Sequence, residues 1–252
     1  MQITADLVRT AHADAWQVEA DLRRSLGGDS ATVPGARLSA TGLGHARWNS
    51  GDVHDPASAD IEEIRAWYAA RGVPWGLRLP EGARWGHGRR ILTRSLMGLT
   101  GSAYVNQPAV SRLVIRAAKP DDLNEVLAVD AAAFGPAPDG EPSWTLPHLG
   151  SAEVDAVLAL VDAVPVATAY AVRSDGLAGA AALLGGVCVL PSVEGRGIGS
   201  AVTAWLVGRA FDSGAALVHL QAETERAAAM YERLGFTTVD GFDIYTDVMD
   251  PG

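Results

Sequence analysis

Three glycines at alternate positions, Gly195, Gly197 and Gly199, separate an apolar stretch from a segment with helical periodicity. Glycine lets the backbone turn freely, and it lets a ligand approach without a Cβ in the way. Successive backbone amides at the start of a helix form a concave site for anions. The segment 195–200 therefore predicts a binding site for a diphosphate group.

Two common phosphate loops fit this segment less well. A dinucleotide loop reads G-x-G-x-x-G directly after a strand. Here the third glycine of that pattern would fall on Ser200, and the preceding apolar run already ends at Leu190. A mononucleotide P-loop requires a lysine after its last glycine. The only lysine of the chain is Lys119, which lies far from the loop in sequence.

The segment strongly resembles the cofactor loop of the GNAT N-acetyltransferase superfamily. That loop has a strand ending V-x-V, followed by P-x-x-[RQ]-G-x-G-x-[GA]. The matching residues here are Val187-Cys188-Val189, Pro191 and Gly195-Arg196-Gly197-Ile198-Gly199. Two further family signatures occur in the expected order, I-R-x-A-x-x-x-D-L at 115–123 and A-x-x-x-Y-x-x-x-G-F at Ala227, Tyr231, Gly235 and Phe236. The three signatures lie within residues 111–252.

The resemblance implies acetyl-coenzyme A as cosubstrate and transfer of its acetyl group to a primary amine by direct attack in a ternary complex. The cofactor-binding residues that it implies are Val187, Cys188, Val189, Gly195, Arg196, Gly197, Ile198, Gly199, Ser200 and Thr224. Two of the family's residues differ here. Glu194 replaces an Arg or Gln, with Arg196 as the nearest cation to offset it, and Thr224 replaces an Asn. These departures keep open an alternative function, a catalytically silent acyl-coenzyme A sensor or scaffold.

Catalytic groups can be proposed on two of the late elements. The resemblance implies that Tyr231 protonates the departing thiolate as a general acid. His219 and Glu223 alternate with apolar residues on one strand, so both are candidates for the base that accepts the amine's proton, directly or through a water. Structural roles compete with each of these, since a core tyrosine, a packed histidine and a strand-end glutamate would fit the same pattern. Cys188 fits a small apolar filler better than a nucleophile.

The elements that would position these groups alternate between strands and helices. Apolar periodicity predicts helices at residues 5–26, 61–71, 120–131, 198–211 and 225–234. Strands are expected within 36–53, at 73–79, 91–99, 113–115, 154–161, 164–172, 180–190 and 215–222, and twice near the C-terminus at 236–239 and 242–248. The predicted fold class is α/β: a GNAT fold with a mixed, largely antiparallel sheet flanked by helices, in two tandem units.

The domain boundary is expected near residue 110, after a stretch rich in Gly, Ser, Asn and Pro. Residues 111–252 would be the catalytic GNAT domain. Residues 1–110 contain no comparable glycine loop, yet their segment 66–73 echoes 229–236 in its Ala, Tyr and Gly positions. We therefore predict that residues 1–110 form a degenerate GNAT-like unit without a cofactor. Whether this half has a function of its own cannot be read from the sequence. Its five tryptophans are expected in the core.

Charge and composition constrain the partners. The net charge is −10, with +1 in residues 1–110 and −11 in residues 111–252. An acidic second half disfavours nucleic acid and suits a cationic partner, such as a small-molecule or peptide amine. No apolar run reaches the roughly 20 residues that span a bilayer, and no signal-peptide core is evident, so we expect a cytoplasmic protein without a membrane partner. The sequence leaves the acceptor open, and it is compatible with a homodimer.

Overall fold

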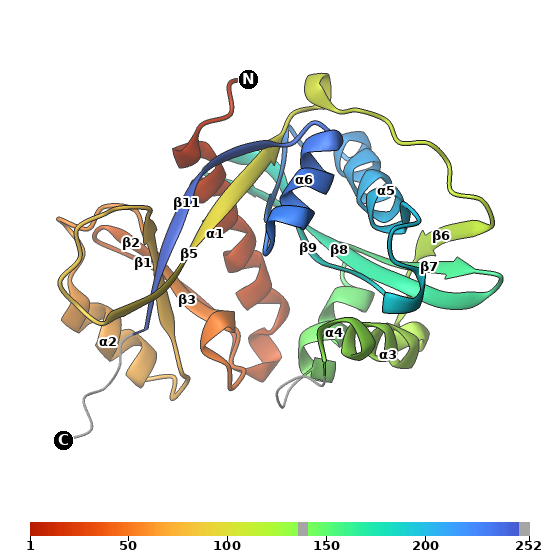
Figure 1. Cartoon of the computed structure of the whole chain (residues 1–252). Coiled ribbons are helices and arrows are strands. Elements are labelled where there is room, and N and C mark those ends of the chain that lie inside the picture. Colours follow the sequence, from red (N-terminus) through yellow and green to blue (C-terminus); the bar gives the residue numbers. More distant parts are fainter. Residues whose placement is uncertain (136–140, 247–252) are drawn as a thin grey trace.

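A single eleven-stranded sheet runs through the protein in the computed structural model, which describes residues 1–135 and 141–246 (Figure 1). The strands lie in the order β1-β2-β3-β4-β11-β5-β10-β9-β8-β7-β6. Their bounds are β1 Asp29–Val33, β2 Ala36–Ala40, β3 Asn49–Val53, β4 Gly76–Pro80, β5 Arg89–Leu99, β6 Leu113–Ala117, β7 Val154–Val161, β8 Val164–Gly176, β9 Gly179–Val189, β10 Leu217–Gln221 and β11 Thr237–Thr246. The α/β class with a mixed, largely antiparallel sheet is confirmed.

Helices cover both faces of this sheet. They are α1 Ala5–Leu22, α2 Ile61–Ala69, α3 Leu123–Phe134, α4 Glu141–Gly150, α5 Ile198–Asp212 and α6 Glu225–Arg233. Strand residues alternate between the faces. In β4, for example, Leu77 and Leu79 pack into the core under α2, while Arg78 points to the face that α1 covers. Helices α2, α5 and α6 thus cover one face, and α1, α3 and α4 cover the other.

Polar side chains fix where three of the helices begin. Thr4 accepts a hydrogen bond from the backbone N–H of Leu7 at the start of α1 (3.2 Å). Asp60 accepts one from Glu62 at the start of α2 (2.9 Å), and Thr224 accepts one from Ala227 at the start of α6 (3.1 Å). Each satisfies a backbone donor that the first helical turn leaves free. The two caps expected from the sequence, Asp60 and Thr224, are therefore present.

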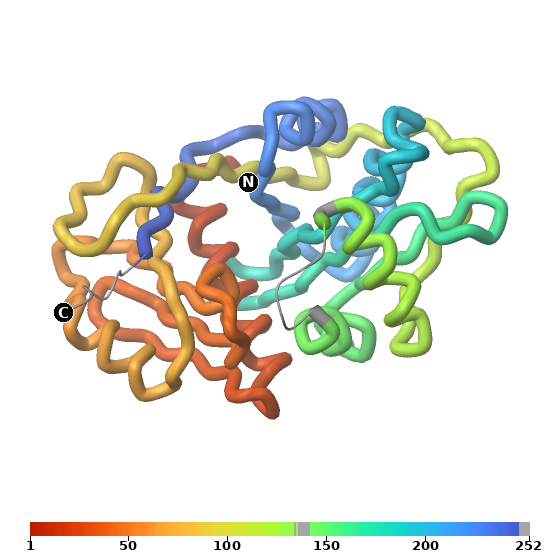
Figure 2. The backbone as a smooth tube through the Cα atoms, turned by 60° about the horizontal axis from the view of Figure 1, so that its bottom comes forward, coloured from red at the N-terminus to blue at the C-terminus, as the bar shows by residue number. Residues whose placement is uncertain are grey.

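Each half of the chain contributes a strand to the other half's part of the sheet. Strand β5 lies between β10 and β11, with Leu99 opposite Val218. Strand β11 lies between β4 and β5, with Phe242 opposite Pro80. Figure 2 shows this C-terminal strand, in blue, among the orange and yellow N-terminal strands. The proposed division at residue 110 remains a prediction, but it does not divide the sheet.

The two halves share an internal pattern. Strands β1, β2 and β3 are antiparallel, and α2 then connects β3 to the parallel strand β4. In the same way β7, β8 and β9 are antiparallel, and α5 connects β9 to the parallel strand β10. A tandem arrangement accounts for this repetition. The counterpart of α2 is therefore α5, whereas the sequence echo between 66–73 and 229–236 matches α2 with α6, a helix at a different topological position.

Three elements differ from the sequence prediction. Strand β1 and helix α4 were not expected. The two C-terminal strands are one strand, β11, whose register shifts between Val239 and Phe242. Gly241 lies at this shift, where a Cβ would approach the carbonyl oxygen of Arg94 to 1.8 Å, so the chain passes too closely for any side chain. The last two residues of the predicted strand 242–248 lie outside the described residues.

The exchanged strands predict that residues 111–252 do not fold alone. Both neighbours of β11, strands β4 and β5, belong to residues 1–110. We expect the isolated 111–252 fragment to lack a cooperative thermal transition by circular dichroism, because β11 would have no strand to pair with. Co-expression with residues 1–110 should restore the transition. A fragment that melts cooperatively at the temperature of the full chain would contradict the prediction.

Candidate active site

The parallel strands β9 and β10 separate at the middle of the sheet. Their register runs from Ala181 opposite Leu217 to Leu184 opposite Leu220, and β9 then continues to Val189 beside β8 alone. The separation coincides with a bulge in β9, where the register with β8 shifts between Thr168 and Tyr170. A strand leaving its neighbour exposes backbone N–H and C=O groups, which an extended ligand can pair with.

The glycine loop follows this strand and begins helix α5. Gly195 and Gly197 have left-handed backbone angles (φ 77° and 80°), a conformation that L residues with a side chain rarely adopt. Gly197 is the N-cap of α5. A Cβ at this position would contact only the side chain of Val110, at 3.6 Å, so the space beside the glycine is open. At Gly199 a Cβ would lie 3.3 Å from Sδ of Met230, so the glycine lets α6 pack against the start of α5. The first backbone amides of α5 thus face an open loop.

The strand residues predicted to bind the cofactor alternate between the two faces. Val187 and Val189 pack toward the core under α5, while Cys188 points to the face of α3. Ile198 is buried in the same core as the valines, and Arg196 is exposed on the loop. The apolar side chains therefore hold the loop and strand in place, and a ligand would meet the backbone polar groups and the exposed guanidinium of Arg196.

The two departures from the family pattern have local partners. The carboxylate of Glu194 pairs with Arg226 of α6 at 3.1 Å, rather than with Arg196 as expected. This ion pair is solvent-exposed, and it leaves Arg196 without an ion pair among the described residues. Thr224 uses its hydroxyl to cap α6. Neither residue removes a backbone amide from the loop.

Tyr231 lies on α6 with its ring in the core and a T-shaped contact to Phe236 (5.7 Å between centroids). The residue is only 7% exposed. Burial raises the pKa of its hydroxyl to about 12, and the negative charge of Glu223 adds to this shift. The hydroxyl therefore stays protonated at neutral pH and can donate a proton.

Glu223 follows β10, just beyond the point where the strands separate. Its side chain is 56% exposed and lies 3.6 Å from Arg47, which belongs to the first half of the chain. An exposed ion pair of this kind contributes little to stability. It does show that the first half reaches the open end of the β9–β10 separation, where a predicted catalytic residue stands.

His219 lies on the opposite face of β10 from the core of α5 and α6. It is fully buried, its ring lies 6.0 Å from that of His12 on α1, and burial lowers its pKa to about 3. Neither ring nitrogen has a hydrogen-bond partner in the described structure. A base must reach the proton that it accepts. The burial of His219 beneath α1 disfavours it as the base. His219 therefore does not lie with the exposed Glu223 on one accessible surface, as their alternation along the strand predicted.

Asp130 is a candidate that the sequence did not reveal, because it lies within an apolar helix and belongs to no motif. On α3, it accepts hydrogen bonds from the hydroxyl of Thr168 and from the thiol of Cys188 (3.1 Å). Burial raises the pKa of its carboxyl group, and burial together with the charge of Asp130 raises the pKa of Cys188 to about 12. Cys188 therefore remains a thiol, in line with a structural role, and Asp130 is a carboxyl group with a raised pKa, as is frequent at functional sites.

A small cavity extends from Asp130 to the bulge of β9. Its volume is about 30 Å³, enough for one or two waters. Asp130, Thr168, Tyr170 and Gly186 are among its lining residues. The ring of Tyr170 lies against Gly186, where a Cβ would approach it to 2.8 Å. The cavity thus connects a half-buried carboxyl group to the strand segment that leaves β10.

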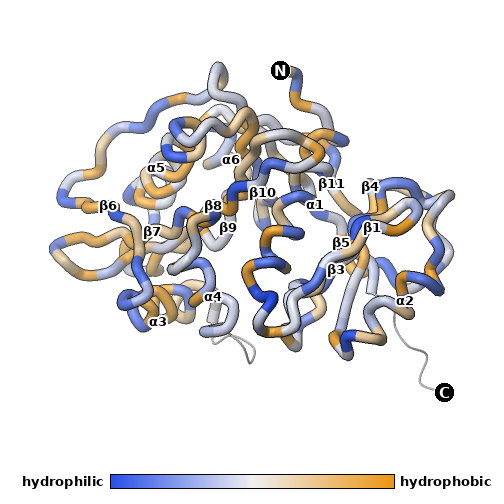
Figure 3. Tube along the Cα trace, turned by 180° about the vertical axis from the view of Figure 1, so that it is seen from behind, coloured by the Kyte–Doolittle hydropathy of each residue, from blue (hydrophilic) through white to orange (hydrophobic). Residues whose placement is uncertain are grey.

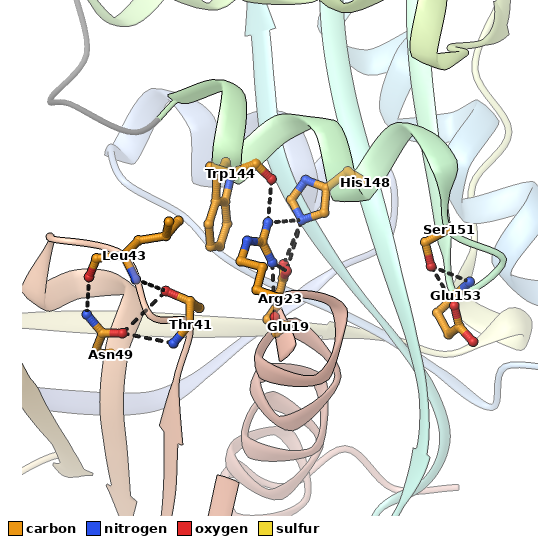
Figure 4. Close-up of polar contacts among 9 residues, drawn as sticks. All are labelled: Glu19, Arg23, Thr41, Leu43, Asn49, Trp144, His148, Ser151 and Glu153. Atoms are coloured by element: carbon orange, nitrogen blue, oxygen red, sulfur yellow. Dashed lines mark hydrogen bonds and ion pairs between the residues drawn. The ribbon is translucent and has the colours of Figure 1, made fainter. Parts of the chain in front are cut away.

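Aromatic residues from both halves stand beside this cavity. Trp144 of α4 stacks on Trp48 (5.1 Å between centroids, 8° between planes), and the guanidinium of Arg23 lies 4.0 Å above the ring of Trp144. Figure 4 shows Arg23 between Trp144, His148 and Glu19, which come from α4 and α1. Trp48 is buried, as expected for a core role, but its partner also lines the cavity.

Buried ionic contacts hold α4 against α1. Glu19 pairs with Arg23 at 2.5 Å and with His148 at 2.9 Å, and all three side chains are almost fully buried. Burial alone would raise the pKa of Glu19, but His148 and Arg23 outweigh it and the pKa is lowered. The carboxylate form is therefore the one that joins the helices. This cluster fixes the wall of the cavity, and no sequence motif marks it.

Comparison with known proteins agrees with this geometry. Residues 124–236 match the family model described as Acetyltransferase (GNAT) family, and this range contains the loop, Asp130, Glu223 and Tyr231. None of the curated proteins matches the chain. In the described part of the chain, no helix combines the length and apolar character needed to cross a membrane.

Two solved structures resemble nearly the whole chain. A GCN5-related N-acetyltransferase from Kribbella flavida matches with a TM-score of 0.68 and 21% identity, over 94% of this chain and 96% of that one. A functionally unknown conserved protein from Staphylococcus epidermidis matches with a TM-score of 0.58 and 18% identity, over 88% of this chain and 95% of that one. At these identities they show a shared fold, which includes the first half.

Proposed function

We propose that this protein, which contains an acetyltransferase domain of the GNAT family over residues 124–236, transfers an acetyl group from acetyl-coenzyme A to a primary amine. The acceptor is a small-molecule or peptide amine, and the two substrates react in a ternary complex. The proposal rests on the family match together with the site built by β9, β10 and α5.

The observation that carries the proposal is the coincidence of three features at one place in the sheet. Strands β9 and β10 separate after Leu184 and Leu220, and the left-handed glycines 195 and 197 lie between the end of β9 and the start of α5. Tyr231 lies on α6 in the core that also contains Ile198 of α5, and its neighbour Met230 packs against Gly199. In this arrangement the diphosphate of acetyl-coenzyme A would bind the amides at the start of α5. The pantetheine arm would pair with the backbone of β9, residues 186–189.

The reaction would proceed by attack of the neutral amine nitrogen on the thioester carbonyl carbon. A C–N bond forms, the C–S bond breaks, and the amine gives up one proton. Tyr231 would deliver a proton to the departing thiolate, because its hydroxyl is protonated at neutral pH and so has a proton to give. The acetyl group would pass directly to the amine and not through an acetyl-cysteine intermediate on Cys188. The raised pKa of the Cys188 thiol leaves little thiolate to attack the thioester.

Two carboxylates are candidates for the base, and we favour Asp130. Glu223, expected from the sequence, is exposed and paired with Arg47, so water can relay a proton to it. Asp130 lies in the cavity that reaches Gly186, and its raised pKa brings it closer to the value that suits a base at neutral pH. A half-buried carboxylate would also attract a cationic amine toward the mouth of this cavity before the amine loses its proton.

Replacing Gly197 by Val should abolish binding of coenzyme A. The substitution places a branched side chain at a left-handed N-cap, where the diphosphate must approach the amides. A ligand at about 100 Kd stabilises a protein by roughly 2.7 kcal/mol. The wild type should therefore show a clear rise in melting temperature with coenzyme A, and the variant should not.

Gly214→Val is a matched control, since Gly214 is also left-handed (φ 94°) but follows the far end of α5. Both variants carry similar backbone strain, so each melting temperature is compared with and without ligand. The rise should persist in Gly214→Val. An undiminished rise in Gly197→Val would exclude the loop as the binding site. Binding by the wild type without acetylation of any amine in a panel would favour a silent acyl-coenzyme A binder.

Replacing Tyr231 by Phe should slow turnover by about 10²- to 10⁴-fold and leave cofactor binding nearly unchanged. The ring and its contact with Phe236 remain, while the proton donor is lost. Tyr104→Phe serves as the control, because Tyr104 also loses a hydroxyl at the edge of the same core. Steady-state acetylation under conditions where chemistry limits the rate provides the comparison. Turnover equal to that of the wild type would assign Tyr231 a structural role.

Replacing Asp130 by Asn should lower kcat/KM and remove the part of its rise with pH that lies below the pKa of the amine substrate. The base must be deprotonated to act, so the wild-type rate should increase as the pH rises through the raised pKa of Asp130. Glu223→Gln should retain that increase. A pH profile that persists in Asp130→Asn and disappears in Glu223→Gln would assign the base to Glu223 instead.

A further inference from the structure

A second pocket lies in the first half of the molecule, between α1 and strands β2, β3 and β4. Its volume is about 270 Å³, close to the lower end of small-molecule sites. The turn between β8 and β9, with Leu177 at its tip, closes one side. Figure 3 shows α1 crossing this face of the sheet beside β3 and β9. None of the residues assigned to acetyl transfer lines this pocket.

Charged residues form a row across the floor of the pocket. The strand register places Arg37 of β2 beside Asp52 of β3, and Asp52 beside Arg78 of β4. Three adjacent strands thus present Arg, Asp and Arg side by side on the α1 face. All three side chains are at least nine-tenths buried. Such a row is costly to bury unless its groups are paired or meet a ligand.

Each of the two arginines uses only some of its guanidinium nitrogens in hydrogen bonds to the protein. Arg78 donates Nε and Nη2 to the two oxygens of Asp52, each at 2.8 Å. Arg37 donates Nη2 to Asp14 (2.5 Å) and Gln17 (2.6 Å), and Nη1 to the carbonyl of Thr10 (3.4 Å). Nη1 of Arg78 and Nε of Arg37 make no hydrogen bond in the part of the chain that the structure describes. Two buried guanidinium groups therefore keep free donors beside the pocket that they line.

The same floor can also accept a cation. Asp52 receives both of its strong hydrogen bonds from Arg78, and a carboxylate has lone pairs for about four. Ion pairs Arg37–Asp14 and Arg78–Asp52 leave the row without a net charge. A ligand that carries a single charge, of either sign, would leave the row and ligand together with a net charge. A ligand that carries both charges would match the alternation of guanidinium and carboxylate.

The remaining walls are mixed: Asp6, Arg9, Thr10 and His54 line part of the pocket, and apolar residues line the rest. Phe242 of β11, Val53 of β3, Ala13 of α1 and Leu177 line the pocket around the charged row. Leu177 is 80% exposed at the rim of the pocket. An apolar group bound beside the row would cover it. The pocket thus has charged groups of both signs on its floor and a small set of apolar side chains beside them.

We propose that this pocket binds a free α-amino acid with an apolar side chain. The carboxylate would meet the free donors of Arg37 and Arg78, whose planar groups match a carboxylate in two-point contact. The ammonium would lie against Asp52, and the side chain would pack on Phe242, Val53 and Leu177. The site is separate from acetyl transfer, and the proposal holds whichever amine the second half acetylates.

L-Leucine, isoamylamine and 4-methylpentanoate are suitable probes, because the last two each lack one charged group of the first. Isothermal titration on the full chain should show saturable binding of L-leucine, at least tenfold tighter than of either analogue. Arg78→Lys keeps a cation beside Asp52 but removes the free donor, and it should weaken L-leucine binding at least tenfold.

Leu177→Glu tests the same pocket at an exposed position, so it does not depend on the buried ion pairs surviving a substitution. It should also weaken L-leucine binding at least tenfold, because it replaces the apolar rim by a charge. Val164→Glu, at an exposed apolar residue of the β7–β8 turn, is the matched control and should bind like the wild type.

The absence of saturable L-leucine binding to the full chain would overturn the proposal. So would binding of either analogue as tight as that of L-leucine, since the pocket would then not recognise both charges. Binding that survives unchanged in Leu177→Glu would place L-leucine elsewhere, such as in the acetyl-transfer site, and would overturn it as well. A failure of the acetylation tests above would leave these results unaffected.

Discussion

The exchange of β5 and β11 between the two halves is the constraint on which the rest of the structure depends. Strand β11 has no neighbour from its own half, and β5 occupies the place beside β10. The exchange removes two open sheet edges from the middle of the molecule. It also brings the first half alongside the site, where Arg47 meets Glu223 and Trp48 stacks on Trp144. A first half without a glycine loop can thus still shape the proposed acetyl-transfer site.

The site itself arises where the same sheet stops being continuous. Strands β9 and β10 pair over only part of their length, and the bulge at Gly186 turns β9 away. The unpaired backbone and the start of α5 offer fixed hydrogen-bond donors, which need no reorganisation when a ligand arrives. Buried contacts among Glu19, Arg23 and His148 hold the opposite wall. The proposed chemistry therefore depends on backbone geometry held by packing, with few side chains acting directly.

What the sequence could predict follows from how local each signal is. The glycine loop, the cap at Thr224 and the strands 154–161 and 164–172 depend on neighbouring residues, and the structure has them where expected. Asp130 could not be found, because its role depends on contacts with Thr168 and Cys188, far away in sequence. The strand that contains His219 and the alternation of its side chains could be predicted. That α1 covers this face of the strand is visible only in the assembled structure. The exchange of β5 and β11 is likewise a property of the assembled sheet.

Hydrogen–deuterium exchange with and without acetyl-coenzyme A would test the central claim most directly. If the ligand binds the separated strand and the start of α5, amides in segments 186–189 and 195–200 should gain protection, because they would pair with the pantetheine arm and the diphosphate. The first half has the equivalent strands β3 and β4 but no glycine loop. Protection confined to residues 49–54 and 76–80, or the absence of added protection at 195–200, would contradict the account.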